Sequence, residues 1–79
     1  MSHHHHDKES AMSFREKLEK LLQHWVKHNT DHAKTYREWM KKAEMEDMKE
    51  AAKRLEEAAA MTIQINEKFE EAILSIAKA

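Results

Sequence analysis

The sequence contains no glycine, no proline and no cysteine. Glycine and proline most often mark tight turns, so their absence argues against sandwiches and barrels, which need many turns. Without cysteine the chain can form neither disulfides nor thiolate metal sites, and any metal ion must be held by imidazole or carboxylate groups. Abundant alanine, glutamate, lysine and leucine then favour long helices.

The charge balance and the absence of long apolar runs exclude two classes of partner. Fourteen basic and fifteen acidic side chains give a net charge of -1, too even to create the basic field that attracts nucleic acid or anionic membrane. No apolar run approaches the roughly 18 residues of a membrane span, and the N-terminus lacks the apolar segment of a signal peptide. We therefore expect a cytoplasmic protein that binds neither nucleic acid nor membrane.

The first twelve residues, MSHHHHDKESAM, lack apolar periodicity and are predicted to form a flexible tail, residues 1–12, ahead of a helical domain at 13–79. The histidines His3 to His6 are either native or the remnant of a cloning tag. Ser13 and Glu16 have the spacing of a capping box, in which each side chain bonds the backbone of the other residue. The first helix should therefore begin at Ser13.

Two amphipathic stripes follow. Apolar residues recur every three or four positions from Phe14 to Ala43, and a second series runs from Met48 to Ile76. The step from Ala43 to Met48 is five residues long, which turns the second series about 140° out of phase with the first. One straight helix therefore cannot hold both series on one face. The pattern predicts an all-α antiparallel two-helix hairpin, with helices at about 13–43 and 47–77. In the turn at 44–47, Asp47 either adopts a left-handed conformation or caps the second helix.

The hairpin brings together residues whose numbers add up to about 91 to 95, which places Leu18 near Ile76 and Trp39 near Leu55. A chain of 79 residues buries only roughly 60% of its unfolded surface, and two helices cannot cover both apolar stripes. We therefore predict that the hairpin dimerises into a homodimeric four-helix bundle.

A polar layer is predicted halfway along the helices. On a helical wheel Asn29 and His32 fall inside the apolar face of the first helix, and the pairing rule sets them opposite Asn66 and Thr62. Buried polar layers of this kind fix register and oligomeric state. They support one possible function, a structural oligomerisation or interaction module without a metal ion.

The stretch HWVKHNTDHAKTY supports another function, because His24, His28 and His32 follow one another at a spacing of four. Imidazoles four apart lie about 6 Å from each other on one helix face and can chelate one ion. The whole row spans about 12 Å, too long for three ligands to one ion from one chain. Asp31 is a further candidate ligand. The wheel makes His28 the likeliest ligand, with His24 or Asp31 beside it, and turns His32 toward the other helix.

Such a site needs further ligands from the second helix, a partner subunit, the tail or water. Lys20 and Lys27, close to His24, oppose a bound cation. An open nitrogen and oxygen site suits Ni²⁺, Zn²⁺ or Co²⁺. With no cysteine, and with serines only in the tail, at the helix cap and near the end, we expect no enzyme. The leading hypothesis is a small transition-metal-binding protein, an accessory, buffer or chaperone whose tail captures ions and whose partner is a metal-handling protein.

The stretch LLQHWVKHNTDHAKTYREW resembles a small, uncharacterised prokaryotic helical family whose members carry His-Trp, His-Asn and His-Ala at this spacing, an HWxxHNxxHA motif. Members often have a histidine-rich N-terminal tail, and the resemblance therefore implies transition-metal handling, without an activity to carry over. The matching residues are Leu21, Leu22, His24, Trp25, His28, Asn29, His32, Ala33, Arg37 and Trp39, followed by Leu55, Glu56, Glu57, Ala58, Ala59, Thr62 and Asn66.

Overall fold

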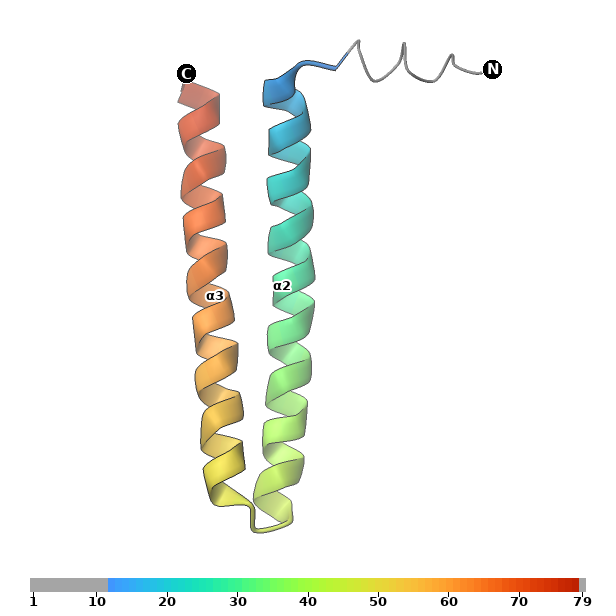
Figure 1. Cartoon of the computed structure of the whole chain (residues 1–79), viewed down its shortest axis with the longest axis vertical. Coiled ribbons are helices and arrows are strands. Elements are labelled where there is room, and N and C mark those ends of the chain that lie inside the picture. The colour runs from blue at the N-terminus through green and yellow to red at the C-terminus, as the bar shows by residue number, and fades with distance from the viewer. Residues whose placement is uncertain (1–11, 79) are drawn as a thin grey trace, which may run out of the picture.

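The computed structural model describes residues 12–78 and folds them into two antiparallel helices (Figure 1). Helix α2 runs from Phe14 to Met45 and helix α3 from Lys49 to Lys78. The start of α2 and the end of α3 lie side by side at one end of the hairpin, and the turn lies at the other. The predicted all-α hairpin is confirmed, with each helix boundary one or two residues further along. The predicted tail, including His3 to His6, lies outside the described residues except for Met12.

The start of α2 is fixed by the predicted capping box. The Ser13 hydroxyl oxygen accepts a hydrogen bond from the backbone N–H of Glu16 at 3.1 Å, and the Glu16 carboxylate accepts one from the backbone N–H of Ser13 at 3.0 Å. These bonds satisfy backbone N–H groups that have no partner inside the helix.

The turn between the helices is built without glycine. Asp47 has a φ of 59°, in the left-handed region. The N–H of Met48 donates to the carbonyl of Ala43 at 2.8 Å, and that of Asp47 to Glu44 at 3.0 Å, which is the Schellman pattern that usually carries glycine at this position. Aspartate tolerates this conformation better than most residues. Of the two roles predicted for Asp47, the left-handed one is therefore correct, and α3 starts two residues later at Lys49.

The side chains between the two helices, here called the seam, alternate at steps of three and four residues, which is the heptad spacing of a coiled coil. The core that they form is small: among the described residues only four hydrophobic side chains are buried, and three of these are alanines. The seam consists of Leu22, Val26, Asn29, Ala33, Tyr36, Met40 and Ala43 from α2 and Ala52, Leu55, Ala59, Thr62, Asn66, Phe69, Ile73 and Ile76 from α3, all buried or half-buried.

Two contacts across the helices confirm the predicted register. Arg37 pairs with Glu56 at 3.3 Å, and the rings of Trp25 and Phe69 lie 5.5 Å apart, centroid to centroid. The residue numbers of these pairs add up to 93 and 94, inside the expected range. The two contacts lie on opposite sides of the seam. Arg37 comes four residues after the seam residue Ala33, which places it on one side, and Trp25 comes one residue before the seam residue Val26, which places it on the other.

The hairpin consequently has two broad faces, one on each side of the seam. The two helices face each other and run in opposite directions. On each side of the seam, a heptad position of α2 therefore lies beside the same heptad position of α3. We call the side of Trp25 the histidine face: Phe14, Leu18, Leu21, Trp25, His28, His32, Thr35, Trp39 and Lys42 from α2, and Ala51, Arg54, Ala58, Met61, Ile65, Lys68, Ala72 and Ser75 from α3.

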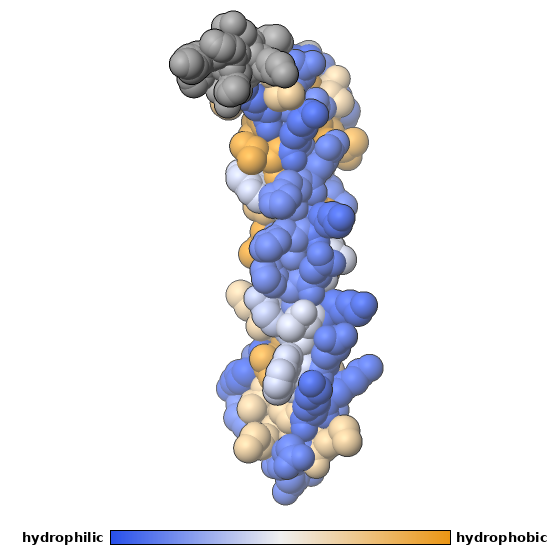
Figure 2. Space-filling model, turned by 90° about the vertical axis from the view of Figure 1, so that its right-hand side faces the viewer, coloured by the Kyte–Doolittle hydropathy of each residue, from blue (hydrophilic) through white to orange (hydrophobic). Residues whose placement is uncertain are grey.

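The side of Arg37 is the charged face. It carries twelve charged residues, against three on the histidine face. Viewed onto the outer side of α2, the molecule has hydrophilic side chains down its middle, and more of the hydrophobic colour lies along its left-hand edge than along its right-hand edge (Figure 2). Within residues 12–78 neither helix is long and apolar enough to cross a membrane. The charged residues of this face are Glu16, Lys20, Lys27, Lys34, Arg37, Lys41 and Glu44 from α2 and Lys49, Lys53, Glu56, Glu67 and Glu70 from α3.

Candidate metal-binding face

Four rings at a spacing of four form a continuous row along α2. The ring centroids of His24 and His28 lie 5.7 Å apart, those of His28 and His32 4.3 Å, and those of His32 and Tyr36 5.9 Å. A helix advances about 6 Å and turns about 40° over four residues, so such side chains touch while the row winds slowly around the axis. The row starts on the outer surface at His24 and reaches the seam at Tyr36.

The closest polar contact in this row joins His28 and His32, whose Nε2 atoms lie 3.0 Å apart. Both residues are exposed. His32 was expected inside the seam, and that prediction was wrong, because Ala33 is the buried neighbour and His32 stays on the histidine face. The ring nitrogen at hydrogen-bond distance from His28 Nε2 therefore belongs to His32.

The 3.0 Å separation of the two Nε2 atoms has two chemical readings. In the first, one neutral imidazole donates its N–H to the bare nitrogen of the other. In the second, an ion takes the place of that proton. An ion about 2.05 Å from both nitrogens would see them about 94° apart, close to adjacent positions of an octahedral or square-planar ion, whereas a tetrahedral ion needs about 3.3 Å between them.

No third ligand from the described part of the chain joins this pair. Residues 12–78 contain no group of three or more histidine, aspartate or glutamate side chains close enough to hold one ion. His24 stacks against His28 at a 21° angle between the ring planes. Asp31 is exposed and is not part of any such group. Of the four residues expected as ligands, the fold brings ring nitrogens of two, His28 and His32, to within 3.0 Å of each other.

The buried polar layer is real but differs from the predicted one. Asn66 is only 5% exposed, and its side-chain amide donates to the carbonyl of Val26 and to the hydroxyl of Thr30, both at 3.1 Å. Asn29, its expected partner, forms no side-chain hydrogen bond with it. Thr62 donates to Ala58 in its own helix, at 2.8 Å, and does not meet His32. The heptad spacing of the sequence places Thr30 directly after the seam residue Asn29, so its position beside the seam could have been predicted.

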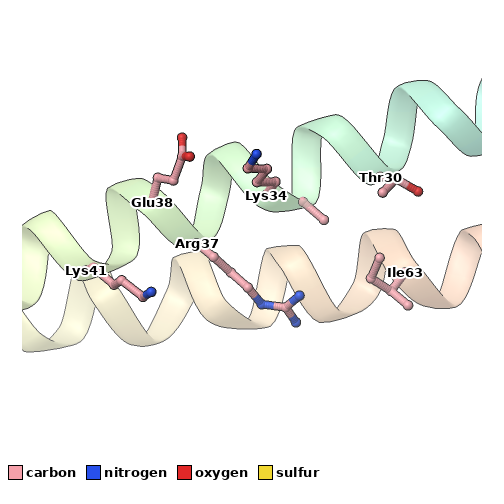
Figure 3. Close-up of a pocket in the computed structure, with 7 residues that line it drawn as sticks. Thr30, Lys34, Arg37, Glu38, Lys41 and Ile63 are labelled. Carbon is pink, nitrogen blue, oxygen red and sulfur yellow. The ribbon is translucent and has the colours of Figure 1, made fainter.

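The charged face holds a shallow groove lined by seven residues (Figure 3). Arg37 reaches from α2 toward α3, where its guanidinium pairs with Glu56, while Glu38 points away from the other helix. No histidine lines this groove. The lining residues are Thr30, Ala33, Lys34, Arg37, Glu38, Lys41 and Ile63.

Comparison with known families places the chain. Residues 18–76 match the family described as Domain of unknown function (DUF8180). This match spans well over half of the 79 residues, and the chain belongs to that family. No curated protein and no solved structure matches it. Membership of an uncharacterised family, expected from the sequence, is confirmed, while the histidine motif and metal handling remain predictions.

Proposed function

We propose that this protein is a small, non-enzymatic transition-metal-binding helical hairpin whose principal ligands are His28 and His32. One observation carries the proposal: the two Nε2 atoms lie 3.0 Å apart on an exposed surface. Two imidazole nitrogens this close can both bind one ion after a small rotation of the rings turns their lone pairs toward it. The proposed ion is Ni²⁺ or Co²⁺ ahead of Zn²⁺, because the separation suits adjacent octahedral or square-planar positions better than tetrahedral ones.

A two-imidazole site suggests a role in holding and passing on ions. Because the hairpin itself supplies two ligands, water or a second protein molecule completes the coordination sphere, and the ion can leave by ligand exchange. Such lability suits a metal accessory protein, a buffer or a chaperone that delivers the ion to a metal-handling partner. His24 and Asp31 take supporting roles in this proposal, His24 through its contact with the His28 ring.

The test uses the full chain with His3 to His6 replaced by serine, so that the tail adds no imidazoles. Ni²⁺ is titrated into this protein and into variants carrying His28→Ala, His32→Ala or His24→Ala. We expect the first two substitutions to weaken Ni²⁺ binding by about tenfold or more, since each removes half of the chelate. His24→Ala serves as the comparison, because the His24 ring only stacks on His28, and its effect on Ni²⁺ affinity should be smaller than that of either ligand substitution.

A second candidate function is a structural interaction module without a metal ion. It is favoured by Asn66, whose two hydrogen bonds to α2 form only in one alignment of the helices. Binding of Ni²⁺ no tighter than about millimolar, or equally tight after His28→Ala, would contradict the metal proposal and favour this module.

A further inference from the structure

The histidine face exposes large apolar side chains over the length of the hairpin. Trp39 is 57% exposed, Met61 63% and Ile65 48%. The seam beneath buries only four hydrophobic residues among those described, so these large apolar side chains remain in contact with water. We therefore expect another protein surface to pack against this face and bury these side chains.

The dimensions of the face match those of a stable protein interface. Helix α2 has 32 residues, which makes it about 48 Å long at 1.5 Å per residue, and two helices side by side are about 20 Å wide. The face thus offers on the order of 1,000 Å² per copy, above the roughly 800 Å² per partner of a standard interface.

Two pairs of α2 residues lie symmetrically about the centre of the face. The midpoint of α2, which runs from Phe14 to Met45, lies between residues 29 and 30. His28 and His32 lie two positions before and after residue 30, and Leu21 and Trp39 lie nine positions before and after it. Consider a two-fold axis that lies in the plane of the face and runs across the helices at this level. It would pair each of these residues with its counterpart in a second copy, as an isologous interface requires.

Helix α3 shows the same symmetry. The register fixed by Arg37 and Glu56 sets residue 30 of α2 level with about residue 63 of α3. Met61 and Ile65 lie two positions before and after that level, so the same axis would bring Met61 of one copy against Ile65 of the other. Two apolar pairs would thus adjoin the histidines at the centre of the interface.

The three cations of the face do not oppose this pairing. The axis would set Lys42 opposite Leu18, Arg54 opposite Ala72 and Lys68 opposite Ala58 of the second copy, so no cation meets another. Long basic side chains can lay their methylene stems over such apolar neighbours and keep their charge in water. Within its own chain the Lys42 ammonium already lies 4.2 Å from the centre of the Trp39 ring.

We infer that a second copy of this chain covers the histidine face and that His28 and His32 of the two copies together hold one ion in a four-imidazole site. This inference rests on the proposed function. It supplies the ligands that the described part of one chain lacks, since four nitrogens at adjacent positions fill the plane of a square-planar or octahedral ion. It also makes ion binding and dimerisation mutually reinforcing, because the ion links the two copies.

The experiment compares two glutamate substitutions on α3 in the full chain with His3 to His6 replaced by serine. Met61→Glu charges the histidine face and Leu74→Glu the opposite side; the two side chains are 63% and 62% exposed, and neither is a ligand. Molecular mass is measured by sedimentation equilibrium with and without Ni²⁺, Ni²⁺ affinity and stoichiometry by calorimetry, and helicity by circular dichroism.

We expect the parent protein to be a dimer that binds one Ni²⁺ per two chains. Met61→Glu should give a monomer at micromolar concentration and weaken Ni²⁺ binding by about tenfold or more, because the second pair of imidazoles is lost. Leu74→Glu should match the parent. A monomeric parent that binds one Ni²⁺ per chain through His28, or equal behaviour of the two glutamate variants, overturns this inference and leaves the proposed function standing. Loss of the His28 dependence overturns the proposed function itself, whatever the mass.

Discussion

The two broad faces of the hairpin differ in charge although the same two helices form both. The histidine face carries three charged residues and the charged face twelve. Both faces follow the heptad spacing of the seam, so helix formation does not distinguish them. The two faces differ in the free energy of hydration of their side chains. Water hydrates the charged side chains of the charged face favourably, whereas it hydrates the exposed apolar side chains of the histidine face unfavourably. We therefore expect partners and ions to bind on the histidine face.

The contacts on the two faces also differ in kind. Beside the histidine face the rings of Trp25 and Phe69 pack 5.5 Å apart, which removes apolar surface from water. On the charged face the pair of Arg37 and Glu56 has side chains that are 42% and 47% exposed, and ion pairs so exposed contribute only about 0 to 1 kcal/mol. Stability should therefore respond more strongly to substitutions on the histidine face.

The largest effect is expected from Trp25→Ala. Trp25 is 39% exposed, so losing its contact with Phe69 should lower the free energy of unfolding by about 2 kcal/mol, less than the 3 to 5 kcal/mol typical of a fully buried tryptophan. Urea unfolding followed by circular dichroism measures this change. Arg37→Ala serves as the control on the charged face, and equal losses from the two substitutions would contradict the asymmetry between the faces.

An intermediate effect, of opposite sign, is expected from Asn66→Leu in the seam between the faces. The Oδ1 atom of Asn66 is buried without a hydrogen-bond partner in residues 12–78, which costs about 1 to 3 kcal/mol. Leucine removes that cost and adds apolar burial, so the free energy of unfolding should rise by about 1 kcal/mol. Thermal unfolding at fixed protein concentration tests this expectation. A fall in the melting temperature would show that the bonds to Val26 and Thr30 are worth more than the unpaired oxygen costs.

The smallest effect is expected on the charged face. A double-mutant cycle with Arg37→Ala and Glu56→Ala should give a coupling free energy below about 0.5 kcal/mol, because solvent and salt screen this exposed pair. Repeating the urea titrations in high salt should reduce it further. A coupling above 1 kcal/mol would mean that the charged face also contributes substantially to the stability of the hairpin. Neither Arg37→Ala nor Glu56→Ala should alter Ni²⁺ affinity, because both residues lie on the charged face.

Much of the fold was predictable from local patterns. The capping box at Ser13 and the phase shift between the two apolar series defined both helices, and the antiparallel register followed from the short turn. The left-handed conformation was one of two roles predicted for Asp47. The spacing of four put His28 and His32 one turn apart on α2, whereas their contact on the outer surface and the bonds of Asn66 to Val26 and Thr30 were not predicted.

The error at His32 has a physical cause. Helix α2 carries two neighbouring apolar stripes, one through Leu22 and Ala33 and the other through Trp25 and Trp39. A single average over both lies between them, and it assigned His32 to the covered side although His32 belongs to the second stripe, seven residues after Trp25 and seven before Trp39. Only the position of α3 shows which stripe is covered, because burial depends on the neighbouring helix and not on the hydrophobicity of one residue.

The sequence by itself determined two long helices, their caps, their antiparallel pairing and the spacing of the histidine row, because each depends on contacts between residues close along the chain or on simple periodicity. The tertiary structure decided the rest. It buried Asn66 against the backbone of α2, turned His32 outward to His28 and separated a charged face from a histidine face. These outcomes depend on how side chains of one helix fill the spaces of the other, and that packing is set only when both helices are in place.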